Sequence, residues 1–163
     1  MEIKEVKPEE WKKVRDLYLE LLKTDPTAFV DEYDEIALKT EEEWRKGFQR
    51  KGKTLVAVDG DRFVGMGCVT FYDELPGIPV FHKLGVLPEY RERGIGTRIV
   101  EARENWALSE GAKRVRLYVI ADRKKTIEFS EKNGYKVTEI LKNNSQRKDG
   151  TFVDVVIMEK DLS

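Results

Sequence analysis

The sequence is poor in the features that mark several large classes of protein. A single cysteine, Cys68, excludes an intramolecular disulfide, and because it lies in an apolar stretch we expect a buried structural thiol. There is no run of about 18 apolar residues and no signal-peptide pattern, so we expect a cytoplasmic protein without a membrane partner. With 30 basic against 31 acidic residues, no excess of positive charge suggests nucleic acid as a partner.

What the sequence does contain is a globular composition with a high charged fraction of 37%. Charges of both signs are interspersed, which is typical of solvated helix faces. Neither internal repeats nor low-complexity linkers occur. Since a length of 163 residues suits one hydrophobic core, residues 1–163 are expected to form a single domain.

Hydrophobic spacing predicts an alternation of strands and helices. Strands are expected at residues 1–7, 54–58, 63–72, 80–87, 115–119, 135–141 and 152–158. Helices are expected at residues 8–23, from a capping box at Thr40 to Gly52, from 95 to about 110, and from a cap at Asp122 to 133. The first two helices are joined by a turn at residues 25–29 and a loop carrying Tyr33, and residues 143–150 are expected to form a polar loop. The predicted order is βααβββαβαββ.

The stretch that follows the central strand is typical of an anion site. The strand turns at Pro88, passes through Arg91-x-x-Gly94-x-Gly96 and enters a helix with Ile95, Ile99, Ala102 and Trp106 on one stripe. The first turn of a helix presents unpaired N–H groups and the positive end of the helix dipole. Glycine lets a phosphate approach the backbone closely. We therefore expect a pyrophosphate cradle here.

Two common phosphate motifs do not fit this spacing. The dinucleotide fingerprint needs a third glycine where Ile99 stands, and the P-loop needs Lys-Ser/Thr where Thr97 and Arg98 follow Gly96. The phrase Leu-Gly-Val-Leu-Pro-Glu-Tyr-Arg-Glu-Arg-Gly-Ile-Gly-Thr instead resembles the acyl-CoA-binding motif of the GNAT superfamily of acetyl-CoA-dependent N-acetyltransferases. The predicted element order is also that of the GNAT fold. It implies an α/β (α+β) structure with a mixed, mostly antiparallel sheet of six to seven strands and about four helices.

The resemblance implies acetyl-CoA as a co-substrate and no metal. It implies that the pantetheine arm pairs with a strand backbone, that a backbone N–H near Val86 polarises the thioester carbonyl, and that backbone N–H groups of the glycine turn hold the pyrophosphate. The implied CoA-binding residues are Leu84, Gly85, Val86, Arg91, Glu92, Arg93, Gly94, Ile95, Gly96, Thr97, Arg123 and Phe129.

A second segment, residues 122–135, resembles the other signature of the family, Asn-x-x-Ala-x-x-Phe-Tyr-x-x-x-Gly-Phe. Phe129, Gly134 and Tyr135 fit it. Arg123, Thr126 and Ser130 stand where Asn, Ala and Tyr are usual. Ser130 therefore occupies the position of the usual acid, although a serine hydroxyl is a poor proton donor.

The sequence does not decide which residue is the general base. The family's usual carboxylate positions are matched by Val80 and Tyr118. His82, the only histidine, shares strand parity with Val80, and its ordinary pKa near 6.5 suits proton removal around neutrality. Tyr118 and Glu74 are rival bases. The expected catalytic residues are thus His82, Ser130 and Tyr118.

The N-terminal phrase Asp-Pro-Thr-Ala-Phe … Glu-Glu-Trp resembles one group of GNAT proteins in which two helices form a wall of the acceptor site. It implies an amine-bearing acceptor of unknown identity, although core packing explains Phe29, Tyr33 and Trp44 equally well. The leading hypothesis is an N-acetyltransferase that works by direct attack in a ternary complex. The alternative is a catalytically weak acyl-CoA-binding sensor or regulatory module, and a ligand-free structural protein is the weakest candidate. A homodimer is compatible with either function.

Overall fold

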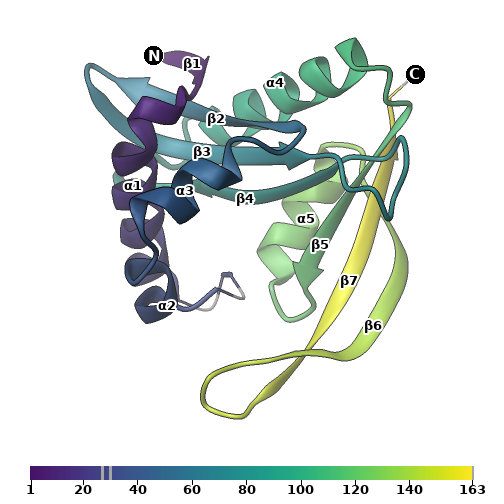
Figure 1. Cartoon of the computed structure of the whole chain (residues 1–163). Coiled ribbons are helices and arrows are strands. Elements are labelled where there is room, and N and C mark those ends of the chain that lie inside the picture. Colours follow the sequence, from purple (N-terminus) through teal and green to yellow (C-terminus); the bar gives the residue numbers. More distant parts are fainter. Residues whose placement is uncertain (27, 30, 163) are drawn as a thin grey trace.

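The computed structural model describes residues 1–26, 28–29 and 31–162, and its core is one seven-stranded sheet (Figure 1). The strands are β1 (Glu2–Glu5), β2 (Gly52–Asp59), β3 (Arg62–Thr70), β4 (Val80–Val86), β5 (Arg114–Ile120), β6 (Lys136–Gln146) and β7 (Phe152–Asp161). They lie in the order β1-β2-β3-β4-β5-β7-β6. The helices are α1 (Trp11–Thr24), α2 (Tyr33–Ala37), α3 (Glu41–Gly47), α4 (Ile95–Ser109) and α5 (Lys124–Lys132), with 3-10 turns η1 (Pro8–Glu10) and η2 (Pro88–Tyr90).

The α1 and α4 helices cover opposite faces of the sheet, and β3 shows why. On one face, Met66 and Cys68 line a cavity together with α1 and α3. On the other face stand Gly65 and Gly67, where a Cβ at Gly67 would lie 2.7 Å from Ile99 Cγ2 of α4. Glycine at this position therefore lets α4 pack directly on the strand backbone.

The sheet splits between β4 and β5. These parallel neighbours pair only at Val80–Arg116 and Phe81–Leu117, and they diverge beyond that point (Figure 1). A bulge on β4 begins there, since Met66 pairs with Gly85 but Cys68 pairs with His82, which leaves two β4 residues opposite one on β3. Lys83, in the bulge, has a φ of 54°. Bulges bend a strand and increase its twist, and this one carries β4 away from β5.

The structure confirms the predicted fold class, with seven strands and five helices, instead of about four, among the described residues. The additional helix is α2, in the expected loop; five residues are too few to show a helical period. The expected second helix, α3, ends at Gly47, and Gly52 begins β2 instead. Of the predicted turn at residues 25–29, Thr27 lies outside the described residues.

Helix termini test several local predictions. The Thr40 side chain accepts a hydrogen bond from the Glu43 N–H at 3.2 Å, which confirms the predicted cap of α3. The α4 helix ends at Ser109 with Glu110 as its C-cap, close to the predicted end, and Gly111 follows in the left-handed conformation with a φ of 86°. The predicted cap of α5 at Asp122 is wrong, because the N-cap is Arg123 and no side chain caps it. Among the described residues, no helix is long and apolar enough to cross a membrane.

Candidate active site

Two cavities meet beside the bulge of β4. The first, of about 260 Å³, occupies the split of the sheet and is called the β4–β5 cavity; its lining includes Leu84, Arg103, Tyr118, Arg123, Phe129 and Ser130. The second, of about 420 Å³, lies between α3 and the sheet and is called the α3 cavity; its lining includes Trp44, Phe48, Arg50, Thr54, Cys68 and Thr70. Tyr18, His82 and Lys83 line both cavities. These three residues therefore stand at the junction.

The β4–β5 cavity offers a free strand edge. Gly85 and Val86 pair with β3 on one side, and no residue of β5 pairs with β4 beyond Phe81. The edge of β4 from Leu84 to Val86 that faces the split therefore has no strand partner in the described chain. An unpaired edge presents backbone N–H and C=O groups to a ligand that can lie along it.

The N-terminus of α4 lies directly after this strand and is uncapped. Its N-cap is Gly94, in the left-handed conformation with a φ of 76°, and it supplies no side-chain acceptor. The Arg98 N–H makes the first helical bond, to the Gly94 carbonyl at 3.1 Å. The amides of Ile95, Gly96 and Thr97 precede that bond, so the helix supplies no acceptor for them. These amides and the helix dipole favour an anion.

Arg91 and Arg93 donate hydrogen bonds to backbone carbonyls around the turn that precedes α4. Arg91 donates from Nε to the Val86 carbonyl at 2.9 Å, and Arg93 donates from Nη2 to the Glu89 carbonyl at 2.9 Å. Glu92, between them, has a φ of 63°. A Cβ at Gly96 would lie 3.4 Å from Phe129, an ordinary contact, so protein packing alone does not demand glycine there. The space above Gly96 is therefore available to a ligand.

His82 is half-buried at the junction of the two cavities. Its Nε2 lies 2.9 Å from Thr70 Oγ1. Burial, reinforced by the charges of Lys83, Arg103 and Arg50, lowers its pKa to about 3. The imidazole is therefore neutral at pH 7. Where Nε2–H donates to Thr70, the lone pair resides on Nδ1, which is then the nitrogen able to accept a proton.

The remaining candidates for proton transfer lie apart from His82 in the chain. Ser130 is buried on α5 and lines the β4–β5 cavity, and its hydroxyl makes no hydrogen bond to the described residues. Tyr118 lines the same cavity but is 47% exposed. Glu74 is exposed and lines neither cavity. The structure thus brings His82 next to the β4–β5 cavity with Ser130 and Tyr118, and leaves Glu74 outside.

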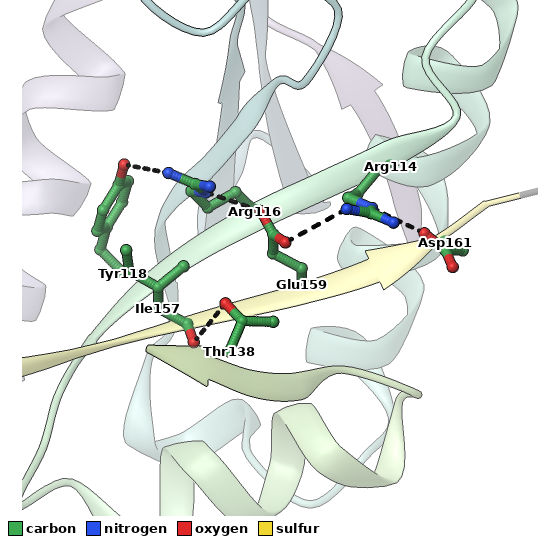
Figure 2. Close-up of polar contacts among 7 residues, drawn as sticks. All are labelled: Arg114, Arg116, Tyr118, Thr138, Ile157, Glu159 and Asp161. Carbon is green, nitrogen blue, oxygen red and sulfur yellow. Dashed lines mark hydrogen bonds and ion pairs between the residues drawn. The ribbon is translucent and has the colours of Figure 1, made fainter. Parts of the chain in front are cut away.

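A chain of ion pairs between β5 and β7 leads to Tyr118 (Figure 2). Arg116 donates from Nε to Glu159 at 2.9 Å and from Nη1 to the Tyr118 hydroxyl at 3.4 Å. Arg114 lies beside it and pairs with Asp161 at 2.9 Å. The Tyr118 side chain is consequently held at the mouth of the β4–β5 cavity by a guanidinium that is itself anchored to β7.

Arg103 is a site residue that the sequence did not reveal. It is buried on α4, its Nη1 donates to the Cys68 carbonyl at 3.2 Å and to that of His82 at 3.4 Å, and its Cζ lies 4.5 Å from the Phe81 ring centroid. Burial lowers its pKa to about 10. The spacing Ile95-Ile99-Arg103-Ala107 was the available signal, because this is the buried stripe of α4; Ala102 and Trp106, predicted on it, are only half-buried. Arg103 ties α4 to the backbone that carries His82.

The loop after α1 adds a carboxylate to the β4–β5 cavity. The hydroxyl of Tyr18, which is fully buried, donates to Asp31 Oδ2 at 2.7 Å, and burial together with Asp31 raises the pKa of this tyrosine. Phe29 packs edge-on against the Tyr18 ring at 5.4 Å. Arg123 also contacts this loop, through an ion pair with Asp25 at 2.7 Å. Asp31, in a loop without periodicity, gave no sequence signal.

The residues expected in the acceptor wall divide between the cavities. Phe29 lines the β4–β5 cavity, and Trp44 lines the α3 cavity. Tyr33 is exposed and lines neither. The N-terminal helices thus contribute to both compartments.

A family model described as the acetyltransferase (GNAT) family matches residues 11–135, which include the split, the glycine turn and α5. The chain belongs to the GNAT acetyltransferase family. A mycothiol acetyltransferase of Corynebacterium efficiens is 36% identical over 91 residues, which are 55% of this chain and 30% of that protein. The chain spans less than a third of the length of the curated relatives it matches.

Solved structures of GNAT proteins share the whole fold. An acetyltransferase of Streptococcus pneumoniae superposes with a TM-score of 0.84 at 20% identity and covers 98% of each chain. A putative acetyltransferase of Salmonella typhimurium, solved with its cofactor acetyl-CoA, superposes with a TM-score of 0.78 at 14% identity and covers 100% of this chain and 94% of that one. At these identities the likeness is one of fold.

Proposed function

We propose that this GNAT protein is an N-acetyltransferase that moves an acetyl group from acetyl-CoA directly to an amine in a ternary complex, as a single domain. The observation that carries the proposal is the split between β4 and β5, which leaves a free strand edge leading to an uncapped helix N-terminus. A strand edge suits the amide-bearing pantetheine arm, and a helix N-terminus suits the pyrophosphate.

The residues present fit acetyl-CoA. Leu84, Gly85 and Val86 would pair with pantetheine through their backbone, and the amides of Ile95, Gly96 and Thr97 would hold the pyrophosphate, with Arg91, Glu92, Arg93 and Gly94 forming the turn. Arg123 and Phe129 line the cavity in which the arm would lie. When bound, acetyl-CoA supplies an activated acetyl thioester. The backbone N–H near Val86 is the donor that would polarise its carbonyl.

The amine would enter from the α3 cavity and meet the β4–β5 cavity at His82. We propose that neutral His82 orients the amine and accepts its proton at Nδ1, with Thr70 fixing the tautomer through Nε2. An imidazole with so low a pKa is a weak base, so most of its contribution is positioning. Tyr118 and Ser130 line the other compartment, where each hydroxyl can hydrogen-bond the departing sulfur; a thiolate needs little further help at neutral pH.

The experiment is thiol release from acetyl-CoA with a panel of amines, together with calorimetry of CoA binding. Turnover with at least one amine supports the acetyltransferase. CoA binding without turnover would favour the acyl-CoA-binding sensor, which is the function suggested by Ser130 at the usual tyrosine position. Absence of both would refute the assignment of the cleft.

A further inference from the structure

The α3 cavity carries an excess of positive charge, although the whole chain has a net charge of −1. Its basic lining residues are Lys39, Lys46, Arg50, Lys53 and Lys83, and its acidic ones are Glu5 and Glu43. A cavity that repels cations is an unexpected environment for an amine, most of which is protonated at neutral pH. The distribution of these charges therefore bears on which amines enter.

Several of these cations already have partners. Lys53 pairs with Glu5 at 2.5 Å, Lys46 approaches Glu42 at 3.8 Å, and the Lys39 ammonium lies 5.5 Å from the Trp44 ring centroid. Arg50 and Lys83 make no ion pair with any of the residues described by the structure. The Lys83 ammonium lies 5.4 Å from the Tyr18 ring centroid, and the backbone of Lys83 is in the left-handed conformation with a φ of 54°. Such a conformation is uncommon for lysine and recurs at functional sites.

A second observation comes from Trp44. Its Nε1 is buried and has no hydrogen-bond partner among the described residues, although Trp44 lines the α3 cavity. An indole N–H can only donate, so an ammonium cannot satisfy it whereas an oxygen can. A buried donor without a partner destabilises the fold, and a bound oxygen would remove that cost.

The charge of Arg50 and of Lys83 also reaches His82, since both contribute to the depression of its pKa. Arg50 and Lys83 therefore line the same cavity as His82 and lie close enough for their charges to act on it. An acceptor bearing only positive charge would be repelled there, and an acceptor with a negative group would neutralise these cations while its amine reaches His82.

We infer that the acceptor is an amine that also bears an oxyanion, a carboxylate or a phosphate-type group, held by Arg50, Lys83 and Trp44 Nε1 in the α3 cavity. The inference rests on the proposed acetyltransferase function and names the substrate class of the same site. Simple alkylamines and polyamines are the acceptors that the cavity disfavours.

The kinetic test compares matched acceptors by thiol release: 6-aminohexanoate and 4-aminobutylphosphonate against hexylamine and 1,4-diaminobutane. We expect kcat/KM to be about tenfold higher or more for the acidic amines, the scale of one charge-assisted hydrogen bond. Arg50→Gln and Lys83→Gln should each raise KM for the acidic amines about tenfold and lower the KM for hexylamine, because a cation that repels its ammonium is removed; Lys12→Gln, an exposed cation of α1 outside both cavities, should change neither. Carboxylate and phosphonate preferences distinguish the two oxyanions.

A binding readout keeps this test separate from turnover. His82 is the only histidine, so its imidazole NMR signals are unambiguous, and 6-aminohexanoate should shift them in wild type but not in the Arg50→Gln/Lys83→Gln double variant. Shifts without thiol release would refute the acetyltransferase and leave the oxyanion site standing. Equal kcat/KM for the charged and uncharged acceptors, or faster reaction of 1,4-diaminobutane, would overturn the inference.

Discussion

The two cavities that meet at His82 offer a ligand different groups, so we call the β4–β5 cavity the backbone site and the α3 cavity the side-chain site. The β4–β5 cavity presents backbone: the free edge of Leu84 to Val86 and the first amides of α4. The α3 cavity presents side chains, among them Trp44, Arg50 and Lys83. A site made of backbone depends on strand and helix geometry and tolerates many sequences, so its ligand is shared across a fold. A site made of side chains is specific to one chain, and the acceptor has to be inferred from its chemistry.

The largest effect is expected from a change that fills only the backbone site. Gly96→Asp places a carboxylate in the space kept open above the first turn of α4, where it competes with the pyrophosphate for the same amides. CoA binding should be lost in calorimetry while far-UV circular dichroism stays unchanged. Gly96→Ala, whose Cβ only reaches ordinary contact with Phe129, is the matched control and should weaken binding much less. Retained CoA affinity in Gly96→Asp would remove the pyrophosphate from this turn.

The next effect is expected at the junction of the cavities. His82→Ala removes the group proposed chiefly to orient the amine, so kcat should fall by about two orders of magnitude, the scale of a lost positioning contact. CoA affinity should not change, because the imidazole is not part of the backbone site. Stopped-flow or steady-state thiol release measures the first quantity, and calorimetry the second. A variant with full activity would transfer the role to another group, with Tyr118 and Asp31 the next residues to replace.

The low pKa of His82 predicts an acid sensitivity with a definite sign. A folded-state pKa of about 3 lies below the ordinary value near 6.5, so between these values the unfolded chain binds a proton that the folded chain does not. The free energy of unfolding should therefore fall as the pH drops below about 6.5, by about 2 kcal/mol at pH 5, and above pH 6.5 the titration of His82 should not change it. Urea unfolding at pH 7 and 5 measures this, with His82→Asn as the control that should lose less. An imidazole NMR titration with a midpoint near 6.5 would contradict the burial of His82.

The smallest effect is expected at Ser130. Its hydroxyl has no hydrogen bond to the described residues and is a poor proton donor, so Ser130→Ala should lower kcat a few fold at most. Ser130→Tyr restores the residue usual in the family and should raise kcat if the β4–β5 cavity admits the ring. A loss as large as that of His82→Ala would show instead that the serine acts directly in the reaction.

The backbone site could be predicted from sequence because its signals are local. Arg91-x-x-Gly94-x-Gly96, the strand before it and the helix after it are contiguous, and the capping pair Thr40–Glu43 is separated by only three residues. The order of strands and helices could be predicted for the same reason, because hydrophobic spacing is also a pattern of neighbouring residues. The predicted polar loop at residues 143–150 was wrong in its first part, because β6 continues to Gln146 by pairing with β7 although almost all of its side chains are exposed.

The side-chain site could not be predicted because its parts converge from distant segments. The pKa of His82 depends on Arg50 before β2, Lys83 in the bulge and Arg103 on α4. The left-handed backbone of Lys83 leaves no pattern in the sequence. Neither the bulge of β4 nor its separation from β5 could therefore be predicted. From its residue type alone His82 is expected to have an ordinary pKa, whereas burial in the fold lowers that pKa.

The most direct measurement is the initial rate of thiol release, with acetyl-CoA varied at several fixed concentrations of 6-aminohexanoate and the product identified by mass spectrometry. Direct transfer across the junction of two cavities requires both substrates to be bound together, so we expect intersecting double-reciprocal lines, an N-acetylated product and no acetylated protein. Parallel lines with an acetylated protein would contradict direct transfer, and CoA binding without thiol release from any amine of the panel would contradict the enzyme itself.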